Sequence, residues 1–206
     1  PNMYRFNSFN SKIYDYNSKV GKDITIPSLD DSIDREKFFS QIRFGWIYTL
    51  DSNDLSELNK INNLIAQYCD KKEVIELWDS YSICERVCNI IMWALTTNLN
   101  NREIILNKQF VNFANISGKI LVENLELHGE KTNNHIINNA RALIIIGVAI
   151  ENSYFVENGI NLLNKWLPIL INDNGFLRER SSHYQLIMLK WLLDISLFLN
   201  ELDKSN

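Results

Sequence analysis

The scarcity of turn-forming residues is the feature that most constrains the fold of this chain. Only 7 glycines and 3 prolines occur among its 206 residues. A β-sandwich or barrel needs a turn roughly every 8–12 residues, and glycine, proline, asparagine and aspartate normally supply those turns. Asparagine is abundant, but much of it lies inside stretches of helical periodicity. The sequence therefore argues against an all-β fold, and its 46% hydrophobic content argues against a disordered chain.

Apolar residues recur at three- and four-residue spacing from Asp34 onward, which is the pattern of amphipathic helices. Ser82 and Glu85 have the spacing of a capping box, in which each side chain bonds the backbone N–H of the other residue. Pro168 lacks a backbone donor and is expected to kink or shorten its helix. The expected helices are 35–50, 54–69, 82–97, 102–128 with a bend near Ser117–Gly118, 134–151, 153–171 and 182–202.

These seven helices have short connections and no strand between them, which predicts an all-α fold built from antiparallel helical hairpins. Residues 1–33 lack the helical pattern and mix asparagine, serine, tyrosine, lysine and aspartate. We expect them to form an irregular lead-in on the surface of the domain, and residues 34–206 to form the helical domain itself.

Charge and cysteine content exclude several classes of protein. The formal net charge of −4 argues against sequence-independent binding to nucleic acid, which needs a basic face. The longest apolar run, Ala142–Ile150, falls short of the roughly 20 residues that span a bilayer. Three cysteines cannot form a complete disulfide framework, and Cys84 and Cys88 stand one helical turn apart. We expect neither a nucleic-acid partner nor a membrane span, and we expect the cysteines to be buried as small apolar side chains.

A polar stripe interrupts one very apolar expected helix. Asn134, Asn138 and Arg141 are spaced i, i+4, i+7, so they share one helix face. Polar side chains on such a helix must face solvent, a cavity or buried partners, because burial without a partner is costly. An exposed asparagine-rich face and a binding face both fit this pattern.

A second candidate region is Gly175–Gln185, where arginine, glutamate, histidine and tyrosine crowd the start of the last expected helix. Backbone N–H groups point outward at such a position and favour anions. Helix starts also carry serine and charge for stability alone, so the two explanations remain open. The three histidines show no HxxxH or similar ligand spacing, and neither a metal nor a cofactor is expected.

Three segments, taken together, follow the pattern of a known family. They read WDSYSICERVCN (residues 78–89), NNH (residues 133–135) and GFLRERSSHY (residues 175–184). The family pattern is a tryptophan before an aromatic–serine–arginine helix start, then an asparagine–histidine pair, then a glycine loop leading to glutamate, serine and tyrosine. In order and separation the segments resemble the helical domain of heparinase II/III-type polysaccharide lyases, over about residues 35–200.

The resemblance implies a fold, a reaction and a partner. The family fold is an incomplete (α/α) toroid followed by a β-sandwich domain, with an anionic polysaccharide bound between them. The implied reaction is β-elimination at a uronic acid, in which a base removes the C5 proton and an acid protonates the leaving oxygen at C4. Such proteins act in the periplasm or outside the cell, whereas the sequence itself does not fix the compartment.

The same resemblance assigns roles to individual residues. Asn134 matches the asparagine that stabilises charge on the uronate, and His135 is its neighbour and a second contact. Tyr184 matches the catalytic tyrosine, with Arg180 one helical turn before it, where positive charge favours the phenolate. Further substrate contacts are expected from Trp78 and from the polar residues of these regions: Arg86, Asn138, Arg141, Arg178, Glu179, Arg180 and His183.

Two departures from the family leave alternatives open. The β-sandwich, which supplies a further catalytic residue, is absent from the 206 residues, and Gln185 stands where many relatives have histidine. The chain is therefore interpreted as the helical part of a larger lyase or, alternatively, as a non-catalytic glycan-binding or assembly module. A toroidal glycoside hydrolase is a weaker alternative, because it needs two facing carboxylates about 5–10 Å apart and Glu179 is the one candidate.

Overall fold

The structure is a computed structural model that describes residues 26, 35–50, 55–71, 73–96 and 102–205. The described part is helical, and its one extended pairing is an isolated antiparallel bridge between Ile171 and Leu177. The predicted all-α class is thus confirmed, while the toroid remains a prediction. The α-helices are α1 (Arg35–Ile42), α2 (Leu55–Asp70), α3 (Ser80–Thr96), α4 (Arg102–Leu106), α5 (Lys108–Glu123), α6 (His135–Ala149), α7 (Ser153–Leu170) and α8 (Ser182–Ser205), with the 3-10 helices η1 (Gly45–Thr49), η2 (Ile75–Trp78) and η4 (Gly129–Lys131).

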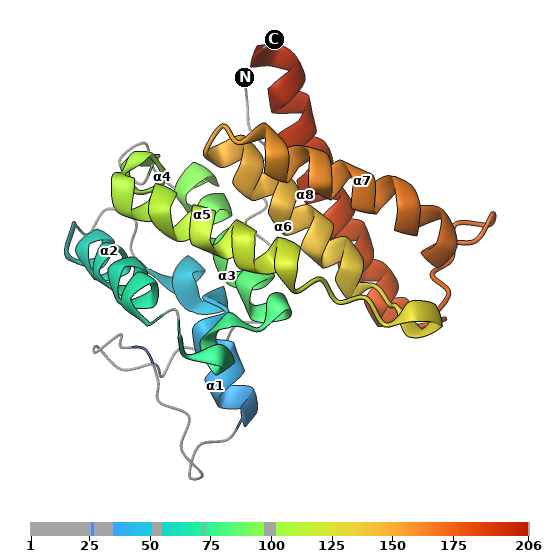
Figure 1. Ribbon diagram of the computed structural model, residues 1–206, viewed down its shortest axis with the longest axis horizontal. Coiled ribbons are helices and arrows are strands. Elements are labelled where there is room, and N and C mark those ends of the chain that lie inside the picture. Colours follow the sequence, from blue (N-terminus) through green and yellow to red (C-terminus); the bar gives the residue numbers. More distant parts are fainter. Residues whose placement is uncertain (1–25, 27–34, 51–54, 72, 97–101, 206) are drawn as a thin grey trace.

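Helix α6 lies at the centre of the fold (Figure 1). Every residue from Ile136 to Gly147 is buried, because α6 packs against α3, α5, α7 and α8. A helix that is apolar on nearly all sides is stable in this position and nowhere else in a water-soluble fold. Helices α6 and α8 begin at the same end of the molecule (Figure 1), which brings their first turns together.

Helix α7 approaches α6 unusually closely, and two glycines make this possible. A Cβ added at Gly159 would lie 2.8 Å from the carbonyl oxygen of Ala140, and one added at Gly147 would lie 2.8 Å from the carbonyl oxygen of Asn152. Neither contact can be relieved by turning a side chain, because the opposing atoms belong to the backbone. The missing side chains therefore fix the distance between the two helices.

Several predicted helix boundaries are corrected by the structure. The expected helix 35–50 is divided into α1 and η1, and the expected helix 102–128 breaks at Asn107 and not near Gly118. Asn107 accepts hydrogen bonds from the backbone N–H groups of Gln109 and Phe110, so it caps a new helix. Gly118 lies within α5, and its missing side chain leaves room for the ring of Phe155 from α7.

The predicted capping box is wrong. Helix α3 begins at Ser80, and the side chain of Asp79 accepts the hydrogen bond from the backbone N–H of Ser82 at 2.9 Å. The side chains of Ser82 and Glu85 are therefore released for contacts with other elements. Pro168 lies inside α7, which continues for two further residues to Leu170, one residue short of the expected end.

The predicted lead-in, residues 1–33, lies outside the described residues except for Ile26, which is buried in the main core. Among the described helices, none has both the length and the apolar character that crossing a membrane requires. Cys84 and Cys88 are buried without a disulfide, as predicted, whereas Cys69 is half-buried.

Candidate functional site

The loop before α6 is held by polar side chains other than Asn134. Asn133 accepts a hydrogen bond from the backbone N–H of His135 at 3.0 Å, and the Glu179 carboxylate accepts one from the backbone N–H of Asn134, also at 3.0 Å. Because these groups satisfy the first donors of α6, the Asn134 side chain is not needed as a cap. Its amide makes no hydrogen bond with the described residues, and the residue is only 3% exposed.

The loop before α8 contacts the loop before α6. Arg178 donates hydrogen bonds to the carbonyl oxygens of Glu130 and Thr132, in addition to the contact made by Glu179. Side chains from 45 to 48 residues further along the chain thus join the two loops. Asn134 and Tyr184 consequently lie at one end of the molecule, because each belongs to the first turn region of a helix that starts there (Figure 1).

Tyr184 lies in the first turn of α8 and is 43% exposed. Its backbone N–H is bonded to the Ser181 hydroxyl, while its phenol has no hydrogen-bond partner among the described residues. The exposed ring of His183 lies 5.8 Å from the Tyr184 ring, centroid to centroid. Arg180 is exposed as well and adopts a left-handed backbone conformation with φ 53°.

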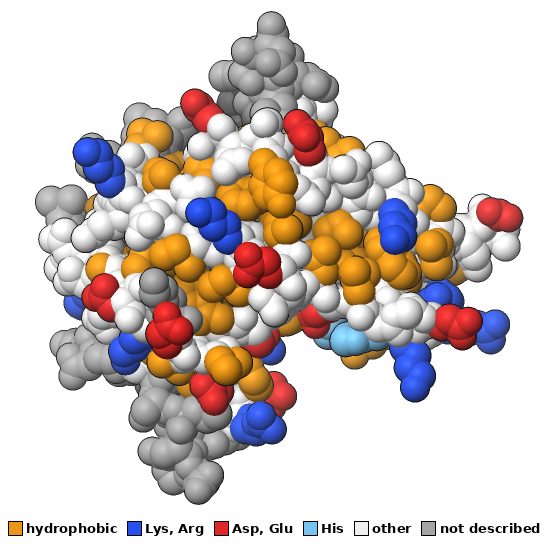
Figure 2. Space-filling model, in the orientation of Figure 1, with side chains coloured by type: hydrophobic (Ala, Val, Ile, Leu, Met, Phe, Trp, Pro, Cys, Tyr) orange, Lys and Arg blue, Asp and Glu red, His pale blue; other side chains and the backbone are white. Residues whose placement is uncertain are grey.

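Gln185 fixes the shape of the loop that carries these residues. Its amide oxygen accepts a hydrogen bond from the backbone N–H of Leu177 at 2.7 Å, and its amide nitrogen donates one to the carbonyl oxygen of Gly175 at 3.0 Å. The residue that departs from the family pattern thus closes the loop onto the first turn of α8. Figure 2 shows lysine and arginine side chains gathered at this end of the molecule.

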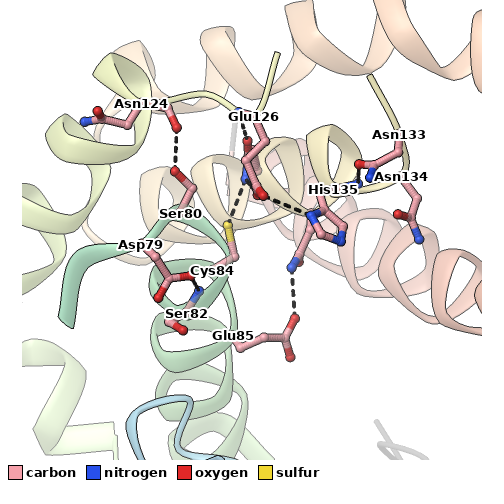
Figure 3. Close-up of polar contacts among 12 residues, drawn as sticks. Asp79, Ser80, Ser82, Cys84, Glu85, Asn124, Glu126, Asn133, Asn134 and His135 are labelled. Carbon is pink, nitrogen blue, oxygen red and sulfur yellow. Dashed lines mark hydrogen bonds and ion pairs between the residues drawn. The ribbon is translucent and has the colours of Figure 1, made fainter. Parts of the chain in front are cut away.

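The His135 ring points toward Glu126, whereas the Asn134 amide is directed away from Glu126 (Figure 3). The Nδ1 atom of His135 lies 2.9 Å from a carboxylate oxygen of Glu126. The histidine ring also stacks against Tyr81, with centroids 4.9 Å apart. Burial raises the pKa of Tyr81 to about 12, with the Glu85 carboxylate adding to the rise, so Tyr81 remains a neutral phenol at physiological pH.

The polar stripe on α6 faces buried partners. Asn138 donates a hydrogen bond to Glu85 at 3.0 Å, and the Arg141 guanidinium lies between Glu85 at 3.5 Å and Asp194 at 3.8 Å. Arg141 also donates to the sulfur of Cys88. Burial alone would lower the pKa of Arg141, but the neighbouring thiol and carboxylates raise it, so the guanidinium stays charged. This network joins α3, α6 and α8 and is closed to a large substrate.

Arg86 and Trp78 were expected at the substrate, and the structure places both in the core. The Arg86 guanidinium donates to the carbonyl oxygens of Ile42 and Leu77 and lies 4.2 Å from the ring centroid of Tyr68. The indole N–H of Trp78 is bonded to a backbone carbonyl oxygen. Neither side chain can reach a glycan, so we no longer regard them as substrate contacts.

Sequence reasoning missed Glu126, Tyr81 and Asp194. Tyr81 belonged to a motif segment, but its position before the expected start of the helix hid its relation to Glu85, one turn later. Asp194 lies one turn after Lys190, a spacing that is typical of an ion pair within one exposed helix face and does not indicate a contact with Arg141. Nothing in the sequence marks Glu126. No cluster of three or more histidine, cysteine, aspartate or glutamate side chains suited to a metal ion occurs among the described residues.

Comparisons of this chain with models of protein families, with curated proteins and with solved structures find no match.

Proposed function

We propose that this chain is the helical domain of a polysaccharide lyase that cleaves a uronate-containing glycan by β-elimination. One observation carries the proposal: the Glu179 carboxylate bonds the backbone N–H of Asn134, which joins the start of α6 to the loop that leads into Tyr184. The sequence resemblance assigns the side chains of Asn134 and Tyr184 to one reaction. The fold supports this assignment, because α6 and α8 begin at the same end of the molecule.

Each side chain has a chemical role in that reaction. Elimination removes the C5 proton of the uronate, turns the C5–H electron pair into the C4–C5 double bond, and breaks the bond from C4 to the glycosidic oxygen. The phenol of Tyr184 is positioned on the surface to exchange a proton with C5 or with the leaving oxygen. The Asn134 amide has no hydrogen-bond partner among the described residues, and the residue is only 3% exposed, so the proposal requires the loops before α6 and α8 to admit the substrate before this amide stabilises the charge that develops on the uronate carboxylate.

The surrounding charge supports an anionic substrate. Arg180 and Arg178 lie on the loop beside Tyr184, and the first turns of α6 and α8 add the partial positive charge of helix N-termini. These exposed cations lie beside Tyr184 although the whole chain carries a net charge of −4 and Glu130 and Glu179 belong to the same two loops. An acidic polymer is thereby drawn to one end of the protein.

The test is to incubate the chain with heparan-type glycans, alginate and related uronates and to follow the absorbance of the unsaturated product. Tyr184→Phe should lower the rate by roughly 10²-fold or more, as expected for loss of an acid–base group. Tyr154→Phe is the matched control, because Tyr154 is an exposed tyrosine in the first turn of α7. Equal rates for the two variants would contradict the proposal, and so would absence of product from every polymer when a version of the chain extended to the next domain is used.

The exposed Arg178 and Arg180 also support a second candidate, a glycan-binding module that does not cleave its ligand. It predicts binding of anionic oligosaccharides, weakened by Arg180→Ala or Asn134→Ala, with no unsaturated product. Calorimetric titration with the same oligosaccharides separates the two candidates, and a flat titration would count against both.

A further inference from the structure

The imidazole of His135 is held at two places. Its Nδ1 atom lies 2.9 Å from the Glu126 carboxylate, and its ring contacts the Tyr81 ring with an angle of 55° between the two planes. The side chain is 37% exposed, and Nε2 has no hydrogen-bond partner among the described residues. One edge of the ring is therefore fixed by the protein, while the other edge is left open.

Glu126 is itself rigidly placed. Its second carboxylate oxygen accepts a hydrogen bond from the amide of Asn139 at 3.2 Å, and its backbone N–H donates to the amide oxygen of Asn139 at 3.0 Å. Asn139 is completely buried on α6, one turn after His135. The carboxylate thus has a defined position relative to the histidine ring.

The protonation state of Glu126 follows from these contacts. Burial raises the pKa of this carboxyl group, but the hydrogen bonds from His135 and Asn139, together with the nearby charges of His135 and His128, outweigh burial and lower the pKa below its ordinary value. An ionised carboxylate only accepts hydrogen bonds, so the proton between the two groups must reside on Nδ1 of His135. A neutral imidazole carries one proton, and its other nitrogen is then an acceptor.

We infer that Glu126 is a positioning residue that holds neutral His135 in its Nδ1–H form, so that Nε2 faces a bound glycan as a hydrogen-bond acceptor. The glycan contact rests on the proposed function, whereas the tautomer does not. Nε2 in this form accepts a hydrogen bond from a sugar hydroxyl and gives none to a carbonyl or carboxylate oxygen. His135 would accordingly select for a free hydroxyl at one position of the ligand.

The tautomer is tested by two-bond ¹H–¹⁵N spectra of the histidine rings of the whole chain at about pH 8, where an ordinary histidine is neutral. His135 should show a protonated Nδ1 and an unprotonated Nε2. His128 and His183, both exposed, are internal references. Equal spectra for all three residues, or a protonated Nε2 in His135, would overturn the inference.

Two variants connect the tautomer to Glu126. Glu126→Gln should shift His135 toward the reference spectra, while the control Glu130→Gln, an exposed glutamate in the same loop, should leave it unchanged. No shift in Glu126→Gln would overturn the inference. If Glu126→Gln does not fold, the spectra of the wild type and of Glu126→Asp, which retains a carboxylate, decide the question. A protonated Nδ1 of His135 in both proteins supports the inference. An unprotonated Nδ1 in the wild type overturns it.

Ligand binding separates this inference from the proposed function. Where wild-type protein binds an anionic oligosaccharide, Glu126→Gln should weaken binding by roughly five- to tenfold, which corresponds to one hydrogen bond, and Glu130→Gln should not. If the wild type binds no oligosaccharide, the proposed function and the glycan contact fail while the spectra still decide the tautomer. If it binds but Glu126→Gln binds equally well, the glycan contact fails while the proposed function stands.

Discussion

Two arginines of the described chain are almost completely buried: Arg86 on α3 and Arg141 on α6. Their surroundings show that one fold can accommodate a buried charge in two different ways. Arg86 lies among the rings of Tyr68, Trp78 and Phe113 and donates to backbone carbonyl oxygens. Burial lowers its pKa. Here aromatic faces and carbonyl dipoles stabilise the cation, and no carboxylate forms an ion pair with it among the described residues.

Arg141, by contrast, contacts two carboxylates from two helices, Glu85 on α3 and Asp194 on α8. The first arginine serves the packing of an aromatic core. The second neutralises acidic groups close to the end of the molecule that carries the candidate site. The comparison teaches that burial alone does not distinguish a structural arginine from one near a site, whereas the partners do.

The largest effect is expected from Arg141→Met, which leaves the mostly buried Glu85 carboxylate without its ion-pair partner and leaves Asp194 with Lys190 alone, at 3.2 Å. Loss of one partner from a buried ion pair costs about 3–5 kcal/mol of unfolding free energy. Urea unfolding measures this loss. Arg141→Met/Asp194→Asn should recover part of it, because one stranded charge is removed. If Arg141→Met lowers the free energy of unfolding by less than about 1 kcal/mol, the ion pairs of Arg141 contribute little to stability.

Arg86→Met should destabilise the protein by a smaller amount, about 2–3 kcal/mol, because two carbonyl oxygens lose their donors and the Asp79 carboxylate loses a nearby positive charge, but no direct ion pair is broken. Lys119→Met is the control, since Lys119 is exposed on α5 and should change stability by no more than about 0.5 kcal/mol. If the same urea experiment gives Arg86→Met a loss as large as that of Arg141→Met, the contrast between the two arginines is wrong.

A smaller effect of opposite sign is expected for Arg180→Gly. Arg180 has φ 53°, a conformation that glycine adopts without strain, so the replacement should stabilise the fold by about 0.5–1 kcal/mol. The same variant should bind anionic oligosaccharides more weakly, because it removes a positive charge beside Tyr184. Thermal unfolding and titration of one preparation test both effects. A variant that is less stable, or that binds as well as the wild type, would contradict the assignment.

The smallest effect concerns pH. Because the folded pKa of Glu126 is lower than the unfolded value of about 4.3, its hydrogen bonds stabilise the protein at pH values above that range. This contribution is lost as the pH falls through the lowered folded pKa. The stability difference between wild type and Glu126→Gln should thus be constant near neutrality and shrink below about pH 4. A difference that does not change on acidification would contradict this.

The sequence was sufficient for elements with strong periodicity and insufficient where a side chain had two possible partners. The bounds of α6, α7 and most of α2 follow from apolar spacing. The start of α3 was misplaced because Ser82 and Glu85 match a capping box, while the structure uses Asp79 as the cap. Local spacing cannot reveal that Glu85 bonds Asn138, which is 53 residues away.

The candidate site shows the same limit. The sequence identified Asn134, His135 and Tyr184 by resemblance, and the two loops that carry them are in contact. It placed Arg86 and Trp78 at the substrate because a motif containing arginine and tryptophan does not show which way either residue points. It gave no sign of Glu126, since a lone glutamate in a polar loop becomes meaningful only when Asn139 and His135 lie beside it.

The close approach of α6 and α7 has a consequence for how the protein assembles. These helices are consecutive, and Gly147 and Gly159 let their backbones meet soon after the turn between them. Contacts between neighbours in sequence form at a low entropic cost, and chains rich in them fold fast. This pair is thus expected to form the folding nucleus, with α3 and α8 docking afterwards through Arg141. The groups proposed to meet the glycan would then come together last.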